Sequence, residues 1–295
     1  MATIQELLTL GKEKLESSGN EYAKYERKVL LEEVLGCNYM YMLMNGEEEV
    51  SGEKEKKYLS LIERRCAHYP LQYLLGYAHF MDYTFYVNED VLIPRNDTEI
   101  LVECASKILE NMTEDICQKA QPVEKGKSKN AVRVLDLCCG TGCIGISLKL
   151  YHREIALTLA DVSQKALEVA KRNLGKYDVR GELICSSLFQ NITGKMDMIV
   201  SNPPYIESRV VDTLMPEVKD YEPLLALDGG EDGLDFYRDI TMQAPDYLNV
   251  GGWLLFEIGY NQKEAVSQIM KAKGFKDIEV KTDYAGLDRV VYGHL

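Results

Sequence analysis

The first 75 residues carry apolar side chains at intervals of three and four positions, which is the spacing of one face of an α-helix. The pattern recurs over residues 4–10, 29–35 and 58–62. The charged stretch 47–57 is interpreted as a solvated loop or as the start of a helix. A small helical domain is therefore predicted for residues 1–76.

Between residues 77 and 94 aromatic and polar positions alternate, which predicts a β-hairpin that links two domains, with a turn near residues 88–90. Asn96 and Glu99 have the spacing of a capping box, so a helix is expected to begin there and to continue through Ile108. The polar stretch 113–130, which contains Pro122 and Gly126, is expected to form an exposed loop.

From residue 131 onward short apolar runs alternate with helical patterns. Strands are predicted at 132–137, 155–160, 183–185, 198–201 and 253–258, and a final hairpin at 278–282 and 290–293. Nearly continuous apolar strands separated by helices are typical of a mostly parallel sheet that is covered on both faces. Residues 95–295 are therefore expected to form a doubly wound α/β domain, in which ligands bind at the carboxyl ends of the strands.

Composition supports a globular protein of two domains, because 295 residues exceed one typical domain and 46% of them are hydrophobic. A net charge of −13 gives no overall field that would attract DNA or anionic membranes, so direct nucleic-acid binding is not expected. The chain begins without a basic region and apolar run of the signal-peptide kind, and no apolar stretch approaches the ~20 residues of a spanning helix. We therefore expect a cytoplasmic protein without membrane contact.

Eight cysteines are spread along the chain, and none belongs to a Cys-x-x-Cys pair. We interpret them as reduced thiols that mostly pack as small hydrophobic residues. Cys138, Cys139 and Cys143 lie close together in sequence, but none of the four histidines is near them. No metal site is predicted.

A glycine-rich turn follows the first strand of the predicted sheet. Gly140 and Gly142 allow a tight turn before a helix whose free N–H groups point at the same place. Read literally, the turn is also the dinucleotide fingerprint Gly-x-Gly-x-x-Gly, with Asp161 at the end of the next strand as the ribose-binding acid or, alternatively, as an acid at a helix start. Asp136, on the strand itself, favours a cationic ligand such as the amino group of S-adenosylmethionine over a pyrophosphate.

The most specific motif follows the fourth strand and reads Asn202-Pro203-Pro204-Tyr205. Two consecutive prolines fix φ and leave rigid carbonyl acceptors beside the Asn202 amide. A planar NH₂ group could donate one hydrogen bond to the Asn202 side-chain oxygen and one to the Pro203 carbonyl, while the Tyr205 ring stacks on it. The loop therefore predicts binding of an amide or amine nitrogen.

Together, the glycine turn and the Asn202–Tyr205 loop resemble those of class I S-adenosylmethionine-dependent methyltransferases that act on a nitrogen attached to an sp² carbon. The resemblance narrows to the HemK family, the N5-glutamine methyltransferases of peptide chain release factors, through the segments 70–76, 92–99 and 221–234. It extends over nearly the whole chain, to the last hairpin near residues 283–290.

This resemblance implies a Rossmann-like, seven-stranded sheet, S-adenosylmethionine as cofactor and S-adenosylhomocysteine as product. The implied cofactor-binding residues are Asp136, Cys138, Cys139, Gly140, Thr141, Gly142, Asp161, Ser187, Leu188 and Asn202. The target glutamine of a Gly-Gly-Gln loop would bind to Asn202, Pro203, Pro204 and Tyr205, with Asn202, Pro203 and Tyr205 in catalytic roles. The helical domain and the hairpin would help to hold the release factor, and a monomer is expected.

Two positions depart from the family pattern. Cys138 stands where many relatives have the first glycine, so the turn must tolerate a Cβ atom at this residue. Ser187 stands where many have an aspartate that could contact the adenine. These departures concern cofactor contacts rather than the fold.

Three other functions fit part of the sequence. An adenine-N6 nucleic-acid methyltransferase would present the same planar NH₂ group to the loop, but the net charge of −13 argues against it. A nicotinamide oxidoreductase would use the literal glycine fingerprint but leaves residues 202–205 unexplained. A binding module without activity would have no need of the complete Asn-Pro-Pro-Tyr loop.

Overall fold

The computed structural model describes residues 1–119 and 131–295, which form two compact units. The helical unit comprises Met1–Tyr77 together with Met215–Tyr221, and the α/β unit comprises Ala78–Leu214 and Glu222–Leu295. The sequence pattern predicts residues 215–221 as part of the α/β domain, whereas the structure groups them with the helices. Residues 120–130 of the expected exposed loop lie outside the described residues.

Five helices form the first part of the helical unit: α1 (Ile4–Ser17), α2 (Ala23–Leu35), α3 (Tyr39–Met44), α4 (Gly52–Cys66) and α5 (Leu71–Leu75). Most of the apolar positions predicted from the spacing, Tyr58 among them, meet in one core, whereas Leu10 is exposed. A capping box starts α1, because Thr3 Oγ1 accepts from the Glu6 N–H while the Glu6 carboxylate accepts from the Thr3 N–H. Within the charged stretch 47–57, Ser51 is the N-cap of α4, so residues 52–57 form the start of this helix.

A buried ion-pair cluster joins residues 215–221, which include α10 (Pro216–Lys219), to the helical unit. The Arg65 guanidinium in α4 contacts the Glu26 carboxylate of α2 at 2.6 Å and the Glu217 carboxylate of α10 at 2.9 Å. The Tyr221 hydroxyl donates to the Ala67 carbonyl at 2.7 Å. These contacts explain why a segment distant in sequence packs with the first 77 residues.

The predicted hairpin is confirmed as β1 (Tyr77–Phe80) and β2 (Tyr83–Tyr86). Its turn lies at Met81 and Asp82, and the turn predicted near residues 88–90 is a separate one outside the hairpin. The Tyr86 N–H donates to Asn173 Oδ1 at 2.7 Å, so the second strand is fixed to helix α8 (Gln164–Lys176) of the α/β unit.

The capping box predicted at Asn96 and Glu99 is wrong. A short 3₁₀ turn, η1 (Asn96–Thr98), precedes α6 (Glu99–Lys119), and Glu99 Oε1 accepts instead from the Met81 N–H at 2.6 Å. The helix also continues through residues 113–119, where a loop was expected. This segment contains no proline or glycine, so polarity alone was a poor signal for the end of the helix.

The predicted seven-stranded, mostly parallel sheet is confirmed, in the order β5-β4-β3-β6-β7-β9-β8. Neighbouring strands are parallel except where β9 pairs with β7 and β8. The strands are β3 (Arg133–Leu137), β4 (Ala156–Asp161), β5 (Glu182–Cys185), β6 (Met196–Ser201), β7 (Leu248–Glu257), β8 (Lys276–Thr282) and β9 (Asp288–His294).

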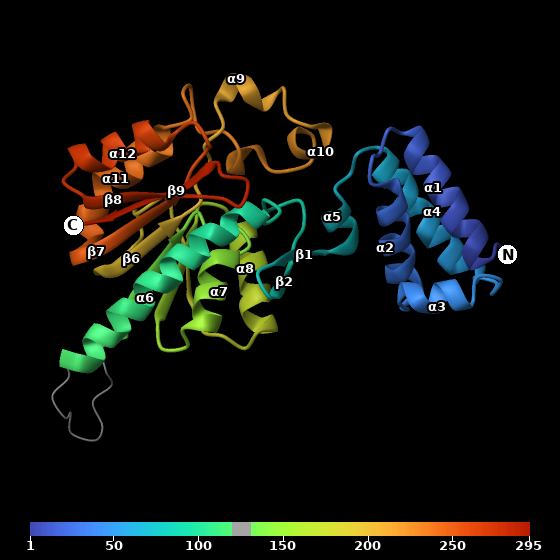
Figure 1. Cartoon of the computed structure of the whole chain (residues 1–295), viewed down its shortest axis with the longest axis horizontal. Coiled ribbons are helices and arrows are strands. Elements are labelled where there is room, and N and C mark those ends of the chain that lie inside the picture. Colours follow the sequence, from blue (N-terminus) through green and yellow to red (C-terminus); the bar gives the residue numbers. More distant parts are fainter. Residues whose placement is uncertain (120–130) are drawn as a thin grey trace. The chain divides into compact units, whose positions relative to one another are not determined.

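Helices cover both faces of this sheet (Figure 1). One face packs against α6, α7 (Cys143–Tyr151) and α8, and the other against α11 (Asp235–Tyr247) and α12 (Lys263–Ala272). Val134 and Leu135 of β3 enter opposite cores, as do Met198 and Ile199 of β6. Both sides of each central strand are therefore apolar, which explains the continuous apolar runs in the sequence.

The connection between β6 and α11 contains α9 (Ser208–Val211), α10 and the 3₁₀ turn η2 (Leu224–Ala226). Among residues 1–119 and 131–295, no helix combines the length and apolar character of a membrane span. In the same part of the chain, no three His, Cys, Asp or Glu side chains are grouped so that they could hold a metal ion.

Two helical glycines provide a test of the packing between helix and sheet. A Cβ atom on Gly145 of α7 would lie 2.7 Å from Leu159 Cδ2 and 3.0 Å from Asp136 Cβ, whereas one on Gly175 of α8 would meet nothing within 4 Å. We expect Gly145→Ala to destabilise the fold by about 1–3 kcal/mol through overpacking. We expect Gly175→Ala to stabilise it by up to about 1 kcal/mol through helix propensity. Urea unfolding measures both, and equal effects would contradict the close packing of α7.

Candidate active site

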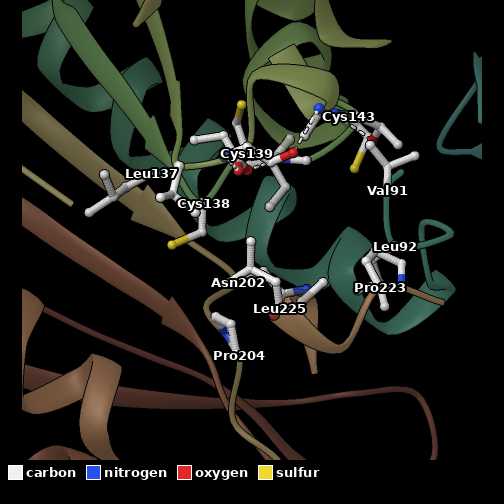
Figure 2. A pocket seen from close by; sticks show the side chains of 18 of the residues that line it. Val91, Leu92, Leu137, Cys138, Cys139, Cys143, Asn202, Pro204, Pro223 and Leu225 are labelled. Carbon is white, nitrogen blue, oxygen red and sulfur yellow. Dashed lines mark hydrogen bonds between the residues drawn. The ribbon is translucent and has the colours of Figure 1, made fainter. Parts of the chain in front are cut away.

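A cavity of about 250 Å³ lies at the carboxyl ends of β3, β4 and β6, within the α/β unit. Figure 2 shows Cys138 and Cys139 along one part of this cavity and Asn202 with Pro204 along another. The expected site residues that line it are Cys138, Cys139, Gly140, Thr141, Asp161, Ser187, Leu188, Asn202 and Pro204. Asp136, Gly142, Pro203 and Tyr205 lie outside the lining.

The turn after β3 is built from left-handed residues. Cys138 has φ +61°, Gly140 +51° and Gly142 +75°. A left-handed conformation is unfavourable for a residue with a Cβ atom, so Cys138 stores strain that glycine would avoid. The turn nevertheless accommodates it, held by hydrogen bonds from the Cys139 N–H to the Ala160 carbonyl and from the Gly142 N–H to the Cys139 carbonyl.

Asp161 ends β4 and holds two backbone segments together. Its Oδ2 accepts from the Gly140 N–H and its Oδ1 from the Ser163 N–H, each at 2.9 Å. Burial raises the pKa of this carboxyl, and these N–H donors lower it. Each carboxylate oxygen has a second lone pair, so the side chain can order the turn and still accept hydrogen bonds from a ligand in the cavity.

Asn202 follows β6 and contributes its side chain to the cavity wall. Its Nδ2 donates to the hydroxyl of Thr98 at 3.4 Å. Tyr205 does not line the cavity, and its hydroxyl donates to Glu257 Oε1 at 3.5 Å. The stacking role that the sequence suggested for the Tyr205 ring therefore stays a prediction.

Comparison with known proteins gives the family. The family described as "PrmC N-terminal domain" matches residues 6–76, and the one described as "Methyltransferase small domain" matches residues 122–218. A release factor glutamine methyltransferase of Geobacter sulfurreducens is 37% identical over 99% of this chain and 97% of its own length. One of Clostridium botulinum is 36% identical, with 98% of each chain covered. This chain belongs to the release factor glutamine methyltransferase family.

Membership confirms the HemK-family resemblance and, with it, a methyltransferase that depends on S-adenosylmethionine. Among solved structures, the hMettl16 catalytic domain in complex with the MAT2A 3′UTR hairpin 6 has a TM-score of 0.51 at 12% identity and covers 82% of each chain. At that identity the likeness concerns the fold alone.

One wall of the cavity is formed by residues that the sequence alone does not predict as part of the site. Residues 90–98 and 223–226 contribute Leu92, Pro94, Arg95, Thr98 and Leu225, among others. The buried Glu222 carboxylate joins the two segments, because it accepts from the Ile93 N–H at 3.3 Å and forms an ion pair with the Arg95 guanidinium. Both segments contributed to the resemblance, but no local pattern assigned them a role.

Asp136 lies behind the glycine turn of the methyltransferase fold. The side chain is fully buried, and its Oδ2 accepts from the Gly145 N–H at 2.8 Å. Its Oδ1 is buried without a hydrogen-bond partner in the described residues. Burial raises the pKa of Asp136 to about 7, and the charge of Asp161 adds to the increase. Direct contact with a cationic cofactor therefore stays a prediction for this residue.

Replacing Asp136 tests this environment. A carboxyl whose pKa is raised by folding stabilises the fold fully below its unfolded pKa of about 3.9, and this contribution is lost as pH rises towards the folded value near 7. Asp136→Asn keeps an acceptor for the Gly145 N–H and carries no charge. Its stability relative to the wild-type protein should therefore increase between pH 5 and 7 and level off above. A stability difference that is the same at pH 5 and 8 in urea unfolding would contradict the raised pKa.

Proposed function

We propose that this member of the family methylates the side-chain amide nitrogen of the glutamine in the Gly-Gly-Gln loop of a peptide chain release factor, in the cavity that Asn202 lines. The observation that carries the proposal is that a single cavity holds the glycine turn, Asp161 and Asn202. One part of the cavity has the chemistry to bind a nucleoside with an adjacent cationic group, and the other presents acceptors for a planar NH₂ group.

The residues present fit S-adenosylmethionine. The Asp161 carboxylate at the end of β4 is the acceptor for the ribose hydroxyls, and the left-handed turn at Gly140 brings backbone to the cavity without a side chain. The loop after β5 contributes Ser187 and Leu188 to the part of the cavity assigned to the adenine; the Ser186 hydroxyl orders this loop by donating to the Leu188 carbonyl at 2.7 Å. When bound, this cofactor supplies an electrophilic sulfonium methyl group.

Asn202 and Pro203 act on the glutamine amide. Resonance makes an amide nitrogen a poor nucleophile, so catalysis depends on orienting it and on accepting its N–H groups. In this scheme the Asn202 side-chain oxygen and the Pro203 carbonyl accept one hydrogen bond each; the Asn202 side chain lines the cavity, whereas Pro203 lies just outside its lining. The adjacent prolines hold these acceptors rigid. In the same scheme Tyr205 holds the loop in place rather than contacting the substrate, consistent with its position outside the cavity lining. The nitrogen releases its proton to water after transfer.

The helical unit is proposed to dock the release factor, and the protein is proposed to act as a cytoplasmic monomer. The net charge of −13 supports a protein substrate with basic patches over a direct contact with nucleic acid.

Asp161 variants test the cofactor site. Asp161→Ala should weaken S-adenosylmethionine binding about 10- to 100-fold, as expected for the loss of charge-assisted hydrogen bonds. Asp161→Asn should lose less, because its amide oxygen keeps one acceptor for the ribose or the Gly140 N–H. Titration calorimetry with S-adenosylmethionine measures both affinities. Unchanged affinity in the alanine variant would exclude the ribose role.

The decisive test of the function concerns Asn202. Asn202→Ala should lower single-turnover methyl transfer to a release factor about 100- to 1000-fold, comparable to the loss of one preorganised electrostatic contact, and leave cofactor affinity nearly unchanged. Asn202→Asp keeps an acceptor and should retain more activity than alanine. The exposed Asn249→Ala, at the start of β7, is the matched control. Transfer near the wild-type rate by Asn202→Ala would refute the role of the loop.

A further inference from the structure

The last carbonyl of the Asn-Pro-Pro-Tyr loop is held by a side chain from outside the loop. Pro203 and Pro204 have no N–H group, so at these two positions the backbone cannot be anchored by hydrogen bonds that it donates. The Gln262 side chain, which is buried directly before α12, donates through Nε2 to the Tyr205 carbonyl at 3.1 Å. Neither the cofactor role nor the substrate role proposed above uses this residue.

The Gln262 amide is paired at both ends, and this determines its orientation. Its Nε2 also donates to the Gly233 carbonyl at 3.1 Å, and its Oε1 accepts from the Gly259 N–H at 2.9 Å. A primary amide has two N–H donors, so both are used on carbonyl oxygens. If the amide were rotated, its oxygen would face two carbonyl oxygens and its NH₂ group would face a backbone N–H. Only one orientation of the side chain is therefore compatible with its surroundings.

A loop that contains glycines packs against the same point of the backbone. A Cβ atom on Gly229 would lie 2.7 Å from Tyr205 Cα, and one on Gly233 would overlap the Tyr205 carbonyl oxygen. The Gly229 N–H donates to the Ile206 carbonyl at 2.8 Å, directly after the Asn-Pro-Pro-Tyr loop. Both glycines belong to the segment 221–234, which contributed to the family resemblance without an assigned role. The missing side chains leave the space in which the Tyr205 carbonyl is bound.

We propose that Gln262 is a positioning residue that holds the Tyr205 carbonyl and thereby fixes the Asn202 amide and the Pro203 carbonyl against the substrate nitrogen. Strand β6 fixes the start of the loop through Ser201, and Gln262 fixes its end. Two prolines of restricted φ lie between, so a displacement of Tyr205 is passed on to the acceptors and is not absorbed by the loop. The proposal rests on the proposed function, because it requires these groups to accept from a substrate amide.

Methyl transfer is sensitive to this position. The amide nitrogen has to approach the methyl group in line, and a displacement of about 1 Å can lower the rate about 100-fold. The cofactor is assigned to the glycine turn after β3 and to Asp161 at the end of β4, whereas the Gln262 side chain bonds to the loop after β6 and to two other loops. Loss of the Gln262 donors should therefore lower kcat and leave the affinity for S-adenosylmethionine nearly unchanged.

The first test is Gln262→Glu in the enzyme. Glutamate keeps the shape and the acceptor for the Gly259 N–H, but it replaces the two N–H donors by an oxygen that faces two carbonyls. The kcat for methylation of a release factor should fall about 10- to 100-fold, with an unchanged dissociation constant for S-adenosylmethionine in titration calorimetry. Gln243→Glu is the matched control, because the Gln243 side chain donates to the Asp239 carbonyl within α11. It should keep both values.

A double-mutant cycle with Asn202→Ala separates positioning from a structural role. If Gln262 acts through the Asn202 loop, Gln262→Glu should cost much less in the Asn202→Ala background than in the wild-type enzyme, because the main group that it positions is already absent. A structural defect would lower the single-turnover rate by the same factor in both backgrounds. That result, or a loss confined to the affinity for S-adenosylmethionine, would overturn the proposal.

Gly233→Ala is the second test, and it decides the question if Gln262→Glu does not fold. The added Cβ atom would displace the Tyr205 carbonyl, so kcat should again fall about 10- to 100-fold. Gly251→Ala is its matched control: the two glycines have φ +72° and +76°, but a Cβ atom on Gly251 would meet nothing within 4 Å. Equal losses of kcat in the two alanine variants would contradict the proposal.

The outcomes distinguish this inference from the proposed function. If Asn202→Ala loses methyl transfer while Gln262→Glu keeps the wild-type kcat, only this inference fails. If the wild-type enzyme methylates no release factor, the proposed function itself fails.

Discussion

The register of four parallel strands is the constraint on which the rest of the structure depends. Leu137 at the end of β3 pairs with Ala160 of β4 and with Ser201 of β6, and Ser201 pairs in turn with Phe256 of β7. Because these strands run in the same direction, each one delivers its next residue to one edge of the sheet. The glycine turn, Asp161, Asn202 and Glu257 meet for this reason, although they are far apart in the sequence.

Two buried carboxyl groups lie near this edge of the sheet, one next to the glycine turn and one next to the Asn202 loop. Asp136 is held by the helix N–H of Gly145 behind the glycine turn, and Glu257 is near Thr98 and Arg289 behind the Asn202 loop. Burial raises the pKa of each to about 7. A buried charge costs free energy unless it is well hydrogen-bonded, so ionisation of either carboxyl weakens the fold.

The chain passes between its two units at residues 77 to 78, 214 to 215 and 221 to 222. Between the last two crossings lies the segment 215–221. Its Glu217 forms an ion pair with Arg65, another residue of the helical unit. The residue directly after that segment, Glu222, holds Ile93 and Arg95 in the wall of the cavity. The helical unit, which is proposed to dock the release factor, is thus directly continuous in sequence with the segment that forms this wall of the cavity.

Local patterns in the sequence determined the strands, the glycine turn, and the positions of Asp161 and Asn202. These features can be recognised from a few consecutive residues, namely the apolar runs, the glycines and the paired prolines. They did not reveal α11, whose interior contains Pro245, or the continuation of α6 over residues 113–119. Nor could they show that Thr98, Glu222 and Glu257 belong to the site. Each is a single polar residue whose partners come from other elements: Asn202 for Thr98, Ile93 and Arg95 for Glu222, and Tyr205 for Glu257. Only the tertiary fold brings these partners together.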